Sequence, residues 1–276
     1  MKNILLSIIL ITIFHLSSYA QMGGMKTKSN VVFKNDDVVF HQIDDHTWVG
    51  NGHLASNESL YIVEGDDRAV LIDAGTQIKD LDKIVASITD KPVRLLATHV
   101  HPDHVGAAGY FPEIYINPAD TVGIPQFMAD YKGKVKFLKD AEIIGLGGRK
   151  LEVVFTPAHT PGSTTFIDKD AGYGFSGDSF GSGNLLLFSG TFSQLIETCR
   201  KIETIMENDG ITHLYPGHYS GSNPETLQRI KDMITLSNDV LSGKVKGEEN
   251  PDNRFGLSLI VSDYGVRINY GEQALK

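Results

Sequence analysis

Four potential metal ligands crowd into the six residues His99–His104, and this cluster constrains the fold more than any other feature of the sequence. Three are histidines and the fourth is Asp103. The cluster directly follows Val93–Thr98, an apolar run typical of a short buried strand. Because sites in α/β folds commonly lie at the carboxyl ends of strands, a turn here can direct three imidazoles and one carboxylate into a single cleft. A solvated polar loop is the alternative.

The single cysteine, Cys199, excludes both a disulfide framework and a zinc site made of cysteines. Imidazole and carboxylate are the usual zinc ligands when thiolate is absent. Cys199 lies on the apolar face of a predicted helix with Leu195, Ile202 and Met206, so we expect it to be a core residue.

Strand and helix patterns alternate along the chain from residue 31 onward, without an internal repeat or a linker. We expect helices over Ile78–Thr89, Phe192–Glu207 and Pro224–Leu241, and a short one over Val105–Phe111. Strands are expected over Val31–Phe40, Leu60–Val63, Ala69–Ile72, Val93–Thr98, Leu151–Phe155, Thr164–Ile167, Gly172–Phe175 and Ile211–Tyr215, with a terminal hairpin from Phe255–Val261 and Gly265–Tyr270. This order predicts a single α/β domain over residues 31–276.

The first twenty residues have the pattern of a secretory signal peptide. Lys2 precedes an apolar run, Ile4–Phe14, that is short for a membrane span, and small residues, Ser18 and Ala20, precede Gln21. We therefore expect residues 1–20 to be removed, residues 21–30 to form a flexible lead-in, and the protein to be periplasmic or secreted without a stable membrane anchor. A membrane anchor or a buried helix is the alternative.

The formal net charge of −9 disfavours nucleic-acid partners, since phosphate contacts require clustered cations. A hydrophobic content of 41% is that of an ordinary globular protein and argues against a disordered or fibrous one. Nothing in the sequence indicates the oligomeric state.

The His99–His104 cluster resembles the metal-binding signature of the metallo-β-lactamase superfamily of hydrolases. Four later or earlier motifs are similar to those of the family and occur in its order; they are centred on Asp73, His159, Asp178 and His218. The resemblance covers nearly the whole chain after residue 30. It implies an αββα sandwich in which two central mixed sheets are flanked by helices.

The resemblance also implies two Zn²⁺ ions per chain, with iron or manganese as alternatives. His99, His101 and His159 would bind the first ion, and Asp103, His104 and His218 the second, while Asp178 would bridge them. Asp103 is in addition the candidate catalytic residue, as a proton shuttle. Asp73 would orient a ligand or a loop rather than bind metal.

The activity implied by the resemblance is attack of a zinc-bridging hydroxide on the carbonyl of a small ester, lactone or thioester. The alternative is an exported zinc β-lactamase; a redox enzyme or a non-catalytic metal module on the same scaffold belongs to a different class. His101 stands where diiron oxidoreductases of the family usually have Glu. Residues 170–199 contain no Lys or Arg, which disfavours a glutathione thioester.

Four residues near these motifs are candidates for the substrate pocket, although packing or solvation explains each equally well: His53, Phe180, Asn184 and Tyr219. The remaining histidines, His41, His46 and His213, are expected to be ordinary surface or core residues.

Overall fold

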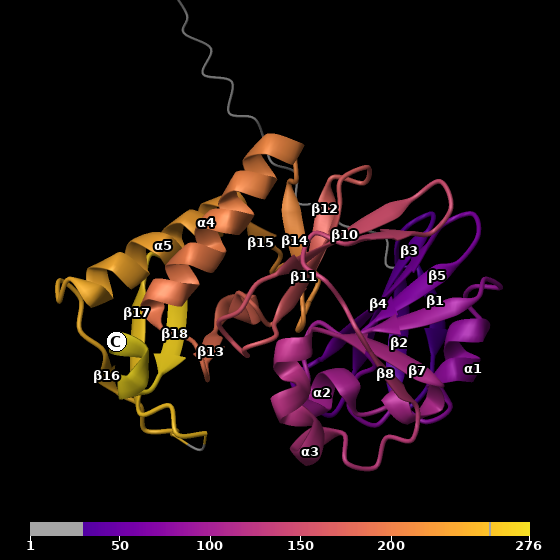
Figure 1. Ribbon diagram of the computed structural model, residues 1–276, viewed down its shortest axis with the longest axis horizontal. Coiled ribbons are helices and arrows are strands. Elements are labelled where there is room, and N and C mark those ends of the chain that lie inside the picture. Colours follow the sequence, from indigo (N-terminus) through magenta and orange to yellow (C-terminus); the bar gives the residue numbers. More distant parts are fainter. Residues whose placement is uncertain (1–29, 254) are drawn as a thin grey trace, which may run out of the picture.

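The computed structural model describes residues 30–253 and 255–276 (Figure 1). The predicted signal peptide and all of the predicted lead-in except residue 30 lie outside the described residues. Within the described part of the chain, each helix is either too short or too polar to cross a membrane.

The first sheet contains eight strands that follow one another in chain order. Neighbours are antiparallel from β1 to β5 and parallel from β5 to β8. The strands are β1 (Val31–Lys34), β2 (Val38–Asp44), β3 (Thr47–Gly52), β4 (Ser59–Glu64), β5 (Ala69–Ile72), β6 (Val93–Leu96), β7 (Glu113–Ile116) and β8 (Lys134–Phe137).

The second sheet contains six strands in the order β15-β14-β12-β11-β10-β9, and only β12 and β14 are parallel to each other. Its strands are β9 (Ile143–Gly145), β10 (Lys150–Phe155), β11 (Thr164–Asp168), β12 (Tyr173–Gly177), β14 (His213–Pro216) and β15 (Glu225–Thr226). Both large sheets are therefore mixed, as predicted.

The two sheets pack face to face over one apolar core. Tyr61 of β4 contacts Phe175 of β12, with 4.9 Å between the ring centroids, and both side chains are buried. The outer face of the first sheet is covered by α1 (Leu81–Ala86), α2 (Pro102–Val105), α3 (Ile124–Phe127) and short 3₁₀ turns. Helices α4 (Phe192–Asp209) and α5 (Leu227–Leu241) cover the second sheet (Figure 1). The predicted αββα sandwich is confirmed.

A third, four-stranded sheet was not expected from the sequence. Its order is β13-β18-β17-β16, with β13 (Leu185–Leu187), β16 (Glu248–Glu249), β17 (Leu259–Asp263) and β18 (Val266–Tyr270). Its apolar side chains, including Ile268 and Tyr270, share a core with α4 and α5. The predicted terminal hairpin is thus present and belongs to this sheet.

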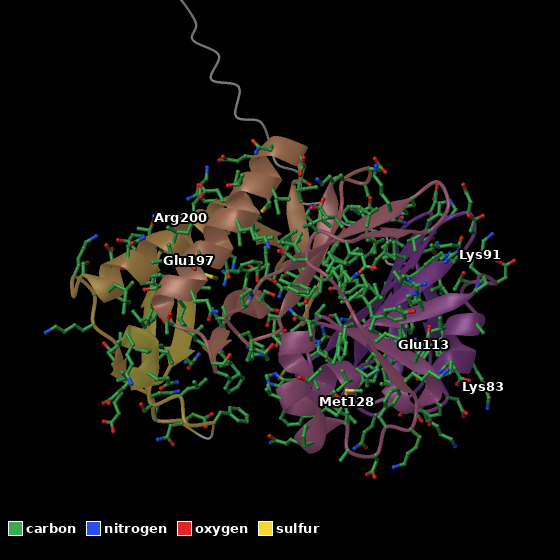
Figure 2. The ribbon with its side chains drawn as sticks, viewed as in Figure 1. Lys83, Lys91, Glu113, Met128, Glu197 and Arg200 are labelled. Carbon is green, nitrogen blue, oxygen red and sulfur yellow. The ribbon has the colours of Figure 1, made fainter. Side chains whose placement is uncertain are left out.

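Helix α4 illustrates why the helix predictions succeed. Thr191 caps its start by accepting a hydrogen bond from the Gln194 N–H (3.2 Å), and Gly210 ends it at φ 68°. The exposed side chains of Glu197 and Arg200 lie on its outer surface (Figure 2). Cys199 is completely buried in the core, as predicted, and burial raises the pKa of its thiol.

Several predicted boundaries are wrong for local reasons. Val31–Phe40 is two strands rather than one, because the Asn35 side chain accepts hydrogen bonds from the backbone of Asp37 and Val38 and closes a turn. The helix predicted over Ile78–Thr89 is only α1, which begins after Asp80 in a left-handed conformation at φ 54°. Phe255–Val261 is strand only from Leu259, and α5 begins at Leu227 instead of Pro224.

Candidate metal centre

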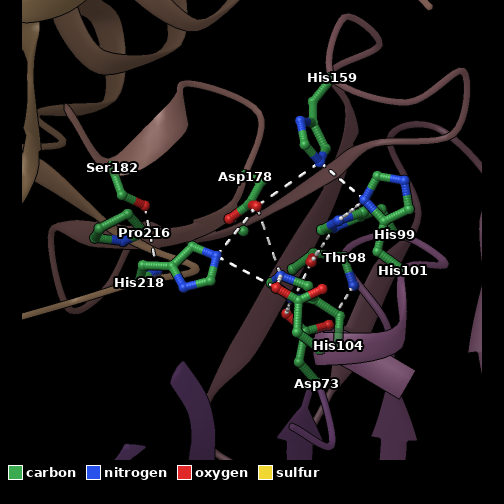
Figure 3. Close-up of polar contacts among 12 residues, drawn as sticks. Asp73, Thr98, His99, His101, His104, His159, Asp178, Ser182, Pro216 and His218 are labelled. Atoms are coloured by element: carbon green, nitrogen blue, oxygen red, sulfur yellow. Dashed lines mark hydrogen bonds and ion pairs between the residues drawn. The ribbon is translucent and has the colours of Figure 1, made fainter. Parts of the chain in front are cut away.

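The predicted ligands all follow strand ends at one edge of the sandwich, where the two large sheets meet (Figure 3). His99 comes shortly after β6, Asp178 directly after β12, and His218 two residues after β14. His159 lies in the loop from β10 to β11. The short helix expected over Val105–Phe111 instead starts earlier, as α2, and carries Asp103 and His104 in its single turn.

Three histidines form the first group of potential ligands. His101 Nδ1 lies 3.0 Å from both His99 Nε2 and His159 Nε2. The three rings therefore direct one nitrogen each toward a common point. Three imidazole nitrogens at such spacing are a typical zinc-binding arrangement.

The second group consists of Asp103, His104, Asp178 and His218, whose potential ligand atoms lie within 4.8 Å of one another. His218 Nε2 is 3.3 Å from Asp178 Oδ2 and 3.5 Å from Asp103 Oδ2. Asp178 Oδ2 also lies 3.7 Å from His159 Nε2 of the first group. One carboxylate oxygen therefore lies between the two groups.

Backbone carbonyls set the orientation of two of these rings. His159 Nδ1 donates to the Leu186 carbonyl at 2.7 Å, and His218 Nδ1 donates to the Ser56 carbonyl at 3.2 Å. Because a carbonyl can only accept, Nδ1 carries the proton in each ring. Both Nε2 atoms consequently present a lone pair to the group.

Asp73 orients one histidine in each group. Its Oδ2 accepts from His104 Nδ1 at 2.8 Å and from the Thr98 hydroxyl at 2.8 Å. Since that hydroxyl has donated its proton, it accepts from His99 Nδ1 at 3.1 Å. Asp73 itself has φ 64°, a strained conformation for a residue other than glycine. This placement agrees with the expectation that Asp73 orients potential ligands.

The electrostatic environments of the two groups differ. Burial, reinforced by the neighbouring imidazoles, lowers the pKa of His99 well below its ordinary value and that of His101 to about 3. Burial also opposes charge on His104, but the surrounding carboxylates, Asp73 above all, raise its pKa well above the ordinary value. The first group is thus a set of neutral donors, whereas the second group stabilises positive charge.

Two buried atoms of the second group lack hydrogen-bond partners among the described residues: His104 Nε2 and Asp178 Oδ1. Such atoms are costly to bury unless something else binds them. Gly217 maintains the space around them, since a Cβ at this position would lie 2.2 Å from Asp178 Oδ1. A nitrogen and an oxygen donor left open in this way fit a bound cation such as zinc.

The structure brings all seven predicted ligands together: His99, His101, Asp103, His104, His159, Asp178 and His218. Their binding of metal stays a prediction. Five of them line a cleft of about 900 Å³. Of the four pocket candidates, only Asn184 lines this cleft. Phe180 is a core residue, and Tyr219 packs against the core between the sheets. His53 is exposed, although the nearby residues Ala55 and Ser56 line the cleft. His41, His46 and His213 lie outside both ligand groups.

Asp120 is a buried residue of the site that the sequence interpretation missed. Its carboxylate accepts from Val100 N–H at 2.7 Å, from the Thr160 hydroxyl at 3.1 Å and from Gly162 N–H at 2.7 Å. It therefore connects the loop of His99 and His101 to the loop of His159. In the sequence Asp120 is an acid in a helical first turn after Asn117, a pattern that signals capping only.

Comparison with known proteins agrees with this architecture. Residues 55–243 match the family described as the Metallo-beta-lactamase superfamily. The human acyl-coenzyme A thioesterase MBLAC2 is 24% identical over 213 residues, which are 62% of this chain and 76% of that protein.

Two solved structures share the fold. A metallo-beta-lactamase family protein from Thermus thermophilus has a TM-score of 0.59 at 16% identity and covers 73% of this chain and 82% of its own. A metallo-beta-lactamase from Pontibacter korlensis also has a TM-score of 0.59, at 15% identity, and covers 74% of this chain and 100% of its own.

Proposed function

The chain belongs to the metallo-beta-lactamase superfamily and is a hydrolase, and from this premise we propose that it uses two zinc ions to hydrolyse a small ester, lactone or thioester. The observation that carries the proposal is the convergence of seven nitrogen and oxygen donors beside a cleft, with two buried donor atoms left without hydrogen bonds within the described residues. Zinc accepts nitrogen and carboxylate donors of this kind.

The ligand assignment follows the two groups. His99, His101 and His159 would hold one ion, and Asp103, His104 and His218 the other. Asp178 would be shared, because its Oδ2 lies 3.3 Å from a donor of one group and 3.7 Å from a donor of the other.

Bound zinc supplies a water molecule that ionises near neutral pH and a Lewis acid for the substrate carbonyl. The residues of the chain supply orientation and proton transfer. Asp73 and the carbonyls of Leu186 and Ser56 hold the imidazoles in the tautomers that bind metal. Asp103 has the more exposed of the two ligand carboxylates, at 22% against 12% for Asp178. It is therefore the better placed to take a proton from water and deliver it to the leaving group.

The name of the human relative favours thioesters over β-lactams, since that protein is an acyl-coenzyme A thioesterase. The cleft itself offers polar side chains but no cation, because none of the described residues that line it is Lys or Arg.

The full chain, stripped of metal by a chelator and reloaded with zinc, provides the test. We expect two zinc ions per chain in elemental analysis, and hydrolysis of a model thioester or lactone that chelation abolishes and zinc restores. A folded, zinc-loaded protein that hydrolyses no carbonyl substrate would contradict the proposal. Efficient turnover of a chromogenic cephalosporin alone would favour the β-lactamase alternative.

We also propose that the protein is exported to the periplasm or secreted. The support is the signal-peptide pattern of residues 1–20. Expression of the full chain in a bacterial host, followed by N-terminal sequencing of the extracytoplasmic fraction, should give a first residue of Gln21. A protein that keeps Met1 in the cytoplasmic fraction would overturn the proposal.

A further inference from the structure

The cleft beside the ligand groups has two chemically different walls. One wall carries three aromatic rings, from Phe127, Phe188 and Phe255, and borders the first ligand group. The other carries small or polar residues such as Ala55, Ser56, Thr76, Ser182 and Asn184. The difference between the walls suits a substrate that is hydrophobic on one side of its reacting carbonyl only, in either the acyl part or the leaving group.

The aromatic wall is continuous from the ligands to the mouth of the cleft. Ring centroids of Phe188 lie 5.4 Å from His101 and 5.1 Å from His159, and that of Phe255 lies 5.8 Å from Phe188. Phe127 also contacts His101, with 5.5 Å between the ring centroids. At the mouth, 66% of Phe255 is exposed to solvent. A hydrophobic group that starts at the reacting centre can therefore follow aromatic surface outward.

Strand β13 builds this wall by alternation. Leu185 and Leu187 point into the core beneath α4 and α5, whereas Leu186 and then Phe188 line the cleft. The same Leu186 holds His159 through its carbonyl. The apolar surface is thus fixed directly to a ligand of the first group and is not a loose loop.

Apart from the potential metal ligands, no described residue that lines the cleft is charged. The walls offer no cation to pair with an anionic group, since none of the described residues that line them is Lys or Arg. The cleft is therefore suited to an uncharged substrate portion.

On the basis of the proposed function, we propose that the acyl part of the substrate is an uncharged hydrophobic chain or ring that lies along Phe127, Phe188 and Phe255. The leaving group faces the wall of small residues. In the reaction, water oxygen bonds to the acyl carbon, the bond from that carbon to the thiol or alcohol breaks, and the leaving group takes up a proton.

Two isomeric thioesters test which side of the carbonyl is recognised. The S-methyl thioester of octanoic acid and the S-heptyl thioester of acetic acid have the same formula, but their chains lie on opposite sides of the carbonyl. With the zinc-loaded full chain and colorimetric detection of released thiol, we expect kcat/KM to be at least about tenfold higher for the octanoyl isomer. Equal values, or a preference for the heptyl isomer, would overturn the proposal.

Substitution at the wall localises the effect. Phe188→Ala should lower the ratio of kcat/KM between the two isomers by about tenfold, because it removes aromatic surface next to both His101 and His159. The matched control is Phe137→Ala on β8, which removes an exposed phenylalanine that does not line the cleft and should keep the ratio. A ratio that falls equally in both variants contradicts the assignment of the wall.

A binding measurement separates failure of this inference from failure of the proposed function. By calorimetry, octanoate should bind the zinc-loaded protein at least about tenfold more tightly than acetate, and Phe188→Ala should remove most of the difference. If thioesters are hydrolysed without acyl preference, the inference fails and the function stands. If no thioester, ester or lactone is hydrolysed, the function fails, and equal binding of the two carboxylates would also refute the inference.

Discussion

The two ends of the β-sandwich each contain a polar cluster, and the clusters differ in how completely their atoms are hydrogen-bonded. At the end opposite the ligands, Arg149 donates to Asp168 Oδ2 at 2.5 Å, to the His46 carbonyl at 3.0 Å and to the Tyr173 hydroxyl at 3.0 Å. Tyr173 in turn donates to Asp44. These contacts join the first sheet to the second, so the cluster has a structural role.

At the ligand end, by contrast, the nitrogen and oxygen atoms of seven side chains converge in two groups. His101 Nδ1 lies 3.0 Å from two other ring nitrogens, and His104 Nε2 and Asp178 Oδ1 have no hydrogen bond within the described residues. The outer ring nitrogens of four of the histidines are hydrogen-bonded, namely those of His99, His104, His159 and His218. A cluster whose outward-facing atoms are hydrogen-bonded and whose inward-facing atoms are not is organised to bind a ligand. A cluster in which all polar atoms are hydrogen-bonded instead stabilises the fold.

The largest effect we expect comes from opening the ligand cluster. His101→Ala should lower zinc-dependent hydrolysis by about 10⁴-fold, because residues that act as one catalytic unit fail together. The free energy of unfolding of the metal-free protein should change by less than about 1 kcal/mol. Activity assays and chemical denaturation check the two expectations. His46→Ala, which removes an exposed histidine at the other end, is the control; full activity in His101→Ala would refute the ligand assignment.

The opposite phenotype is expected at the saturated cluster. Arg149→Met should lower the free energy of unfolding by about 3–5 kcal/mol, because it leaves the fully buried carboxylate of Asp168 without its partner. Activity per folded molecule should be retained. Urea denaturation of this variant beside Arg200→Met, which removes an exposed arginine of α4, provides the measurement. Equal free energies of unfolding for the two variants would show that the contacts of Arg149 between the sheets do not stabilise the fold.

Asp120 combines features of both clusters, since its carboxylate is fully hydrogen-bonded and also holds the loops that carry potential metal ligands. Asp120→Asn loses at least one of three accepted hydrogen bonds and should loosen the loops of His101 and His159. We expect about tenfold weaker binding of one of the two zinc ions, measured by competition with a chromophoric chelator. Asp130→Asn, an exposed neighbour, should leave both affinities unchanged. Equal weakening of both ions would instead indicate a general loss of structure.

The ligand end could be predicted from the sequence because its chemistry is local. His99–His104 follows a buried strand, and the later motifs around His159, Asp178 and His218 each follow strands that the sequence also indicates. That these motifs belong to one site with His99–His104 was implied by the resemblance to the family, and strand ends at one edge of two mixed sheets bring them together. The alternation of strands and helices predicted an α/β domain, and the resemblance to the family added the αββα order of its layers.

What the sequence did not reveal depends on contacts between distant segments. The groups that orient His159 and His218 are backbone carbonyls, at Leu186 and Ser56, and a carbonyl has no residue type to recognise. Asp120 is 40 residues from Thr160, to which it is bonded. Phe188 directly follows β13 of the third sheet, and Phe255 lies in the segment before β17. Their rings meet because both segments approach the cleft.

The smallest effect that we expect concerns Glu225, a buried carboxylate that belongs to neither of the two polar clusters. It is fully buried, accepts from Ser182 N–H at 2.8 Å and pairs with Arg229 at 2.6 Å. Burial raises its pKa to about 7, although Arg229 opposes the shift. Because the folded protein then holds a proton that the unfolded chain releases near pH 4.5, the stabilisation is complete below that pH and is lost as the pH rises toward 7. Between pH 5 and pH 6 the free energy of unfolding of the metal-free protein should therefore fall by about 1 kcal/mol relative to Glu225→Gln. Urea denaturation at several pH values measures the difference, and parallel curves for the two proteins would show that Glu225 is ionised throughout.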